Sequence, residues 1–143
     1  MIDTSNVEQA KNLIKSSKTK PIIVKAQNDD FNRKMLEYGK FEILLSPETG
    51  NRQRSLRQVD SGLNHVLANI AAKNKIAIGM DVEEISKLTK EEKAKRLERI
   101  IKNINICRKA KARLVLLNYK DKKDASNFLI SLGASTKQAK EAF

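Results

Sequence analysis

The sequence has few of the residues that metal sites, disulfides and base-stacking surfaces require. Its 143 residues include one cysteine (Cys107), one histidine (His65), no tryptophan and only 4% aromatic residues. A single cysteine excludes a disulfide within the chain, and one cysteine with one histidine is too few for a usual zinc site. So few aromatic side chains also make a surface that stacks on bases an unfavourable interpretation. We therefore expect binding through charge and shape.

Long apolar runs are missing as well. None approaches the roughly 18 to 20 residues that span a bilayer. The amino terminus, MIDTSNVEQAKNL, carries Asp3 and Glu8 where a secretory signal has basic and then apolar residues. These features predict a soluble chain in a reducing, cytoplasmic setting. The length predicts one domain over residues 1–143, large enough to bury a core without disulfide bonds.

What the chain has in excess is positive charge, and this charge is unevenly placed. The formal net charge is +12, from 29 Lys and Arg against 17 Asp and Glu. Basic and acidic residues number 8 and 7 from Met1 to Gly50, but 21 and 10 from Asn51 to Phe143. A concentrated positive field attracts polyanions, of which nucleic acid is the commonest. The alternative is the well-solvated surface of a lysine-rich protein.

Apolar periodicity predicts alternating strands and helices. Four short runs rich in Ile, Val and Leu are typical of strands buried on both faces: 22–24, 41–45, 76–79 and 114–117. Segments of helical period surround them: an amino-terminal helix with Val7, Ala10, Leu13 and Ile14 on one side, then 29–38, 61–74, 89–112, 121–132 and 135–143. This order, a helix, four βα units and a closing helix, predicts an α/β fold with parallel strands and right-handed crossovers. Four strands are too few to close an eight-stranded barrel, so the sheet stays open or a second chain completes it.

His65 is the one histidine to be explained. In a helix, each residue turns about 100° around the axis. Val66, Leu67 and Ile70 therefore lie within about 60° of Leu63, while His65 lies about 200° away and outside this apolar stripe. A metal centre lacks a second histidine, and a dyad with Asp60 lacks a serine or cysteine nucleophile at a recognisable elbow. A polar contact to RNA or protein and a simply exposed side chain remain the favoured alternatives.

Candidate catalytic groups are sparse elsewhere too. Asp81, Glu83 and Glu84 follow the third apolar run, where barrel enzymes keep their chemistry, so they suit a Mg²⁺-assisted site, a loop cap or plain solvation. The stretch SPETGN has one glycine and no P-loop lysine, which disfavours nucleotide binding. Cys107 lies among apolar helix positions and is predicted to be a buried, inert thiol.

The basic residues fall into two expected groups, one at each end of the sheet. Loops that follow strands should gather Arg52, Arg54, Arg57, Lys120, Lys122 and Lys123. Segments that end helices or begin strands should gather Lys73, Lys75, Lys109, Lys111 and Arg113 at the other end. Phosphate contact is the favoured interpretation of the arginine loop, and a solvated rim is the alternative for both groups. If the arginines are solvated, they contribute little to the stability of the core.

Three stretches carry a family resemblance: LLSPETGNRQRSLRQVDSGLNHVLANIAAKNKIAIGM, ICRKAKARLVLLN and FLISLG. From Pro21 to about Gly133 the chain resembles the archaeal ribonuclease P protein component three family, of the ribonuclease P/MRP p-thirty subunit type. The resemblance implies a TIM-barrel-like (polymerase/histidinol phosphatase-like) fold, truncated here to about four strands. Family members usually start with further strands, whereas this sequence starts at the helix before a middle strand.

The resemblance also implies a function, a non-catalytic subunit of the enzyme that removes the 5′ leader from precursor tRNA. The implied RNA-binding positions are Arg57, His65, Lys73, Lys109 and Arg113, with Lys122 or Lys123 more loosely. Implied partners are the ribonuclease P RNA, which binds the Mg²⁺, precursor tRNA indirectly, and the small protein subunit of the Pop-five/Rpp-fourteen type. No cofactor is expected in this chain. Related metal-dependent phosphoesterases keep rings of His and Asp, which one histidine cannot supply.

Two alternative functions remain at this stage. One is a small metal-dependent phosphoesterase that uses Asp81, Glu83, Glu84 and His65; the other is a general RNA chaperone. The pattern also predicts self-association or a need for a partner, because the first strand would expose an open sheet edge. The amino-terminal helix, a second copy of the chain or the partner subunit is expected to cover that edge.

Overall fold

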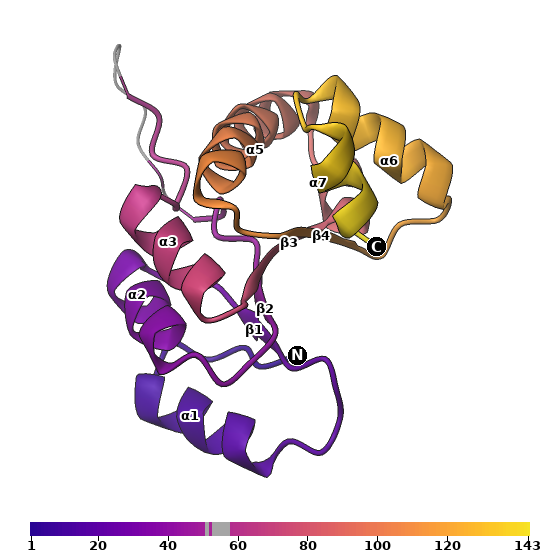
Figure 1. Cartoon of the computed structure of the whole chain (residues 1–143). Helices are drawn as coiled ribbons and strands as arrows, with labels where there is room; N and C mark the ends of the chain where they lie inside the picture. The colour runs from indigo at the N-terminus through magenta and orange to yellow at the C-terminus, as the bar shows by residue number, and fades with distance from the viewer. Residues whose placement is uncertain (51, 53–57) are drawn as a thin grey trace.

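The computed structural model describes residues 1–50, 52 and 58–143, and it places a parallel sheet beside an arc of helices (Figure 1). The strands, in the order β1-β2-β3-β4, are β1 (Ile23–Lys25), β2 (Ile43–Leu45), β3 (Ala77–Asp81) and β4 (Leu114–Leu117). All neighbours are parallel, with Leu44 opposite both Val24 and Ile78, and Gly79 opposite Val115. The predicted alternation of strands and helices is confirmed.

The helices follow the predicted segments with one addition and one shifted start. They are α1 (Val7–Ser16), α2 (Asp29–Tyr38), α3 (His65–Lys73), α4 (Val82–Ser86), α5 (Lys90–Ala110), α6 (Lys122–Ser131) and α7 (Thr136–Glu141). The sequence did not predict α4, and α3 begins at His65 rather than near Ser61. Within the described ranges, no helix is long and apolar enough to cross a membrane.

Side-chain caps set where these helices begin. An Asn, Asp, Thr or Ser before each helix accepts a hydrogen bond from a backbone N–H of the first turn: Asn6, Asn28, Asn64, Asp81, Thr89, Asp121 and Ser135. Such bonds satisfy donors that the helix itself leaves free. At Ser135 the bonds form a capping box, because Gln138 also accepts from the Ser135 N–H. At the other end of α2, Gly39 takes the left-handed conformation with φ 72°, which ends the helix.

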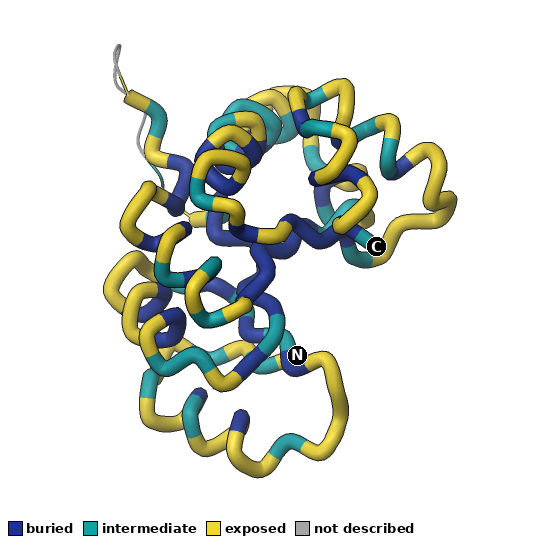
Figure 2. Tube along the Cα trace, viewed as in Figure 1, coloured by how far each residue is buried: buried dark blue, intermediate teal, exposed yellow. Residues whose placement is uncertain are grey.

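The two faces of the sheet differ in what covers them. One face carries Val24, Leu44, Ile78 and Leu114, which share the main core with helix residues such as Ile104, and the strands form the buried centre of the chain (Figure 2). On the other face Ile43, Ala77 and Val115 form a small cluster with Ile23 and Leu117, all of them strand residues. This helix-free face is the side that a closed barrel turns inward.

Cys107 lies in the main core, as predicted. It is fully buried, and desolvation raises the pKa of its thiol to about 12. A thiol that stays protonated is a poor nucleophile, so Cys107 acts as an apolar residue.

Both edges of the sheet receive backbone contacts from the chain ends. Ile2 pairs with Val24 in a parallel bridge: its N–H donates to Ile23 O and its carbonyl accepts from Lys25 N, both at 2.8 Å. At the opposite edge, Leu116 N donates to Ala142 O at 3.1 Å. The extended segment at Ile2, rather than helix α1, therefore pairs with the edge of β1. This differs from the expected cover because pairing requires extended backbone, which a helix cannot offer.

Candidate nucleic-acid interface

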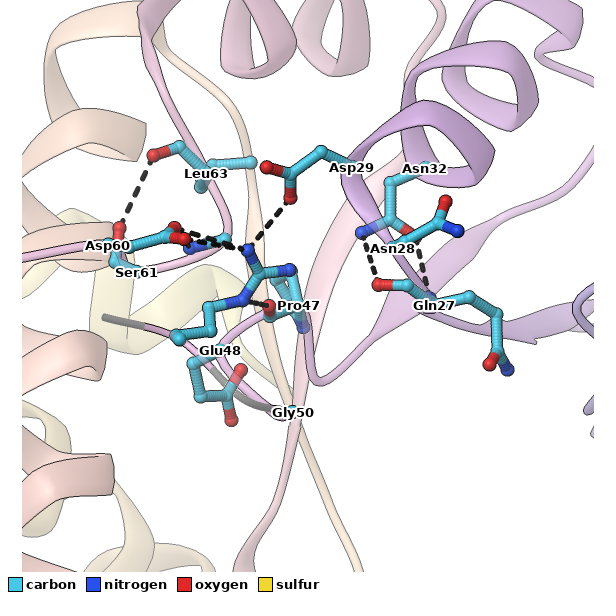
Figure 3. Close-up of polar contacts among 12 residues, drawn as sticks. Gln27, Asn28, Asp29, Asn32, Pro47, Glu48, Gly50, Asp60, Ser61 and Leu63 are labelled. Carbon is cyan, nitrogen blue, oxygen red and sulfur yellow. Dashed lines mark hydrogen bonds and ion pairs between the residues drawn. The ribbon is translucent and has the colours of Figure 1, made fainter.

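The connection from β2 to α3 folds around Arg52, the first arginine of the predicted binding loop. Its Nη1 donates to Asp29 Oδ1 at 2.8 Å and to Asp60 Oδ1 at 3.1 Å, and its Nε donates to Pro47 O at 3.0 Å. The two carboxylates approach the guanidinium from α2 and from the end of the loop (Figure 3). Only 8% of the Arg52 side chain is exposed.

This geometry corrects the expectation for Arg52. A guanidinium that is buried and neutralised by two carboxylates holds the connection together and is not displayed for a phosphate. For Arg52 we now expect a contribution to stability, because its loss would leave carbonyl acceptors without a donor. Arg54 and Arg57, the other two predicted contacts in this loop, lie outside the described residues.

Gly62 makes the turn that leads out of this connection. Its φ is 80°, and a Cβ at this position would lie 1.8 Å from the carbonyl oxygen of Pro47. The Gly62 N–H donates to Asp60 Oδ1 at 3.0 Å, so the same carboxylate serves both the turn and Arg52. Both the backbone conformation and the close approach require glycine.

A buried ion pair lies beneath the connection, and no local sequence pattern predicted it. Glu48 is fully buried, and its Oε1 lies 3.4 Å from Arg96 Nε, while Arg96 Nη2 donates to Glu84 Oε1 at 3.0 Å. Burial raises the pKa of the Glu48 carboxyl, and the Arg96 charge opposes that shift. Neither Glu48 oxygen has a hydrogen-bond partner among the described residues. The pair is therefore costly to bury and fixes α5 against the end of β2.

Helix α3 displays His65 and Lys73 on its exposed side. His65 is the first residue of the helix, and both side chains are exposed. Eight residues separate them, which places them about 80° apart around the helix. Leu67 of the predicted apolar stripe is buried together with Ala68 and Ala71, but Val66 of the same stripe is 52% exposed.

The structure brings the second basic group together at the amino ends of β3 and β4. Lys73 and Lys75 precede β3, and Lys109, Lys111 and Arg113 precede β4; all five are exposed. These two strands are neighbours, and Ile78 N donates to Arg113 O at 2.8 Å. Lys75, Lys111 and Arg113 line a cavity of about 660 Å³ whose apolar lining includes Ala77 and Val115 of the helix-free face.

Lys120, Lys122 and Lys123 lie at the opposite end of the sheet, in the turn after β4 and the first turn of α6. All three are exposed, and Lys122 Nζ lies 5.5 Å from the centre of the Phe143 ring. Because they follow the edge strand β4 while Arg52 follows β2, one strand separates the two groups in the sheet order. The cations at this end thus form a separate group from Arg52.

The carboxylates of the phosphoesterase alternative do not converge. Asp81 caps α4 through Oδ1 and accepts from Asn118 through Oδ2, Glu83 pairs with Lys87, and Glu84 pairs with Arg96. Each carboxylate therefore has a local structural partner. In the part of the chain that the structure describes, no group of three His, Cys, Asp or Glu residues could hold a metal ion.

The fold and the charged ends of the sheet define a class of protein. It is an open α/β protein of TIM-barrel-like βα units, with exposed cations at both ends of the sheet. No family model matches the chain. The resemblance seen in the sequence is nevertheless confirmed, because the chain is similar to curated proteins named ribonuclease P protein component 3. It is 27% identical over 110 residues to the protein of Methanococcus maripaludis strain C7, and 27% identical over 88 residues to that of Methanococcus vannielii.

These matches cover 76% and 62% of this chain, but 44% and 35% of the two relatives. The chain thus spans less than half the length of the curated relatives it matches. A solved chain is also similar, from the cryo-EM structure of archaeal ribonuclease P with mature tRNA. The TM-score is 0.81 at 25% identity, over 98% of this chain and 61% of that one. The TIM-barrel-like fold class is thereby confirmed.

Proposed function

We propose that this protein is a non-catalytic subunit of ribonuclease P that binds the catalytic RNA and supports removal of the 5′ leader from precursor tRNA. The observation that carries the proposal is the structural match: 98% of the chain superposes, with a TM-score of 0.81, on a chain from archaeal ribonuclease P with mature tRNA. The similarity to curated component 3 proteins supports the same role.

The exposed cations are the proposed RNA contacts. At the amino ends of β3 and β4 these are Lys73, Lys109, Lys111 and Arg113, and His65 lies on the same helix as Lys73. Lys120, Lys122 and Lys123 form the second group, and Arg54 and Arg57 complete the set from outside the described residues. Lysine and arginine at such spacing neutralise phosphates without reading bases, which suits a chain with only 4% aromatic residues.

In this proposal the RNA, with its Mg²⁺, carries out phosphodiester hydrolysis, and the protein screens phosphates and stabilises the active RNA fold. The small ribonuclease P subunit of the Pop-five/Rpp-fourteen type is the proposed protein partner, and the cytoplasm is the proposed location. Precursor tRNA is contacted indirectly, through the RNA.

Binding and cleavage assays with the 143-residue chain test this function. We expect tighter binding to a methanococcal ribonuclease P RNA than to an unrelated structured RNA of equal length, and no cleavage of precursor tRNA by the protein alone. Equal binding to both RNAs would favour a general RNA chaperone. Cleavage by the protein alone that is lost in Asp81→Ala would favour the phosphoesterase.

A further inference from the structure

Helix α5 faces the β2–α3 connection with a row of hydrogen-bond donors. Arg99, Lys102 and Asn103 are spaced at i, i+3 and i+4, which places them on one side of the helix. Each donates to main-chain carbonyls of the connection rather than to a side chain. We call these three residues the α5 row.

The α5 row holds both limbs of the connection. On the limb that leaves β2, Arg99 Nη1 donates to Glu48 O at 3.0 Å and Arg99 Nη2 donates to Arg52 O at 2.9 Å. On the limb that enters α3, Lys102 Nζ donates to Val59 O, and Asn103 Nδ2 donates to Ser61 O at 3.0 Å. The two limbs are thereby fixed to one rigid helix.

These contacts commit the cations of the row to the protein itself. Arg99 and Lys102 are half-buried, and the Nη groups of Arg99 and the Nζ of Lys102 already serve carbonyl acceptors. A phosphate that took over the N–H groups making these bonds would leave the main-chain carbonyls without their donors. The basic residues of this region are therefore of two kinds. Some are exposed to solvent, and others donate hydrogen bonds to main-chain carbonyls.

We propose that Arg99 and Lys102 are positioning residues of the RNA interface, which fix the two described limbs of the β2–α3 connection and the start of α3 for binding without contacting phosphates themselves. This inference rests on the proposed function. The limb held by Lys102 and Asn103 leads directly into α3, whose first residue is His65. Order imposed before binding lowers the entropy that association must remove, so it raises affinity.

The dependence of RNA affinity on salt separates positioning from phosphate contact. Arg99→Met and Lys102→Met are compared with Lys90→Met, which removes one charge from an exposed position of the same helix. The dissociation constant for a methanococcal ribonuclease P RNA is measured at several salt concentrations, at a temperature where circular dichroism shows each variant to be folded.

We expect Arg99→Met and Lys102→Met to weaken binding by about 3- to 10-fold more than Lys90→Met, with a salt slope parallel to that of the unchanged protein. A slope reduced by about 0.7 to 0.9 log units would instead show a direct phosphate contact and overturn the inference. Folded variants with unchanged affinity would also overturn it, while binding by the unchanged protein would leave the proposed function standing. If the unchanged protein does not bind this RNA, the proposed function itself fails.

Discussion

At the scale of single residues, the surroundings of a charge decide what it does. Arg52 and Lys111 both belong to basic stretches of the sequence, but Arg52 is buried against two carboxylates and Lys111 is exposed. The pairing of Arg52 with Asp29 joins residues 23 positions apart, which no local pattern reveals. The sequence therefore predicted basic groups at both ends of the sheet, but could not predict which of their cations are exposed.

Arg52→Met tests the structural role of this arginine. We expect it to lower the free energy of unfolding by about 1–3 kcal/mol, because the carbonyls of Pro47 and Thr49 lose their side-chain donor. The ion pairs add little to this loss, since Asp29 and Asp60 are largely solvated. Urea unfolding measures the change, with Lys95→Met as the exposed control on α5, expected within about 0.5 kcal/mol of the unchanged protein. Equal stability of the two variants would remove Arg52 from the structural role.

The buried Glu48 carboxyl should make the free energy of unfolding depend on pH in the opposite sense to an ordinary ion-paired carboxylate. Because burial raises its folded-state pKa above 4.5, the folded state binds the proton more tightly than the unfolded state. Its contribution to stability is therefore complete below pH 4.5 and is lost as the pH rises through the folded-state pKa. The unfolding free energy of the unchanged protein minus that of Glu48→Gln should fall with rising pH across this range. A difference that rises with pH would mean that Arg96 lowers the pKa more than burial raises it.

At the scale of helices and strands, local signals predicted most of the fold. Capping residues and apolar spacing gave α2, α5, α6 and α7 to within about two residues at each end. The start of α3 was placed too early because Ser61 and Gly62 lie in a turn fixed by the long-range contacts of Asp60 and Asn103. Helix α4 was missed because five residues are too few to show a helical period.

The capping box of α7 offers a test at this scale. Ser135→Ala removes the acceptor for the Gln138 N–H, so we expect a loss of about 1 kcal/mol in the free energy of unfolding. Ser131→Ala, at the exposed end of α6, is the matched control because its hydroxyl only donates back to the carbonyl of Phe128. Thermal unfolding of both variants measures the difference. A Ser135→Ala variant as stable as the control would show that packing alone holds α7.

At the scale of the whole molecule, we now expect another protein chain to bind at the helix-free face rather than at the β1 edge. Ile2 already pairs with that edge, whereas Ile23 and Leu117 border a strand-only cluster on the helix-free face. We expect self-association, or stabilisation by the small protein subunit, through the half-buried Ile23 and Leu117 of this face. Sedimentation at micromolar concentrations checks the expectation. A monomer whose melting temperature changes neither with concentration nor with the added subunit would contradict it.

RNA binding through displayed cations is the central claim, and the salt dependence of binding tests it most directly. Lys109→Ala and Lys111→Ala are combined in one variant, and Lys15→Ala and Lys90→Ala in a control with the same loss of charge. Affinity for a methanococcal ribonuclease P RNA is then measured across a series of salt concentrations. We predict that the first variant loses affinity and that its salt slope falls by up to about 0.9 log units per lost contact, while the control keeps nearly the full slope. Equal slopes for the two variants would contradict the claim.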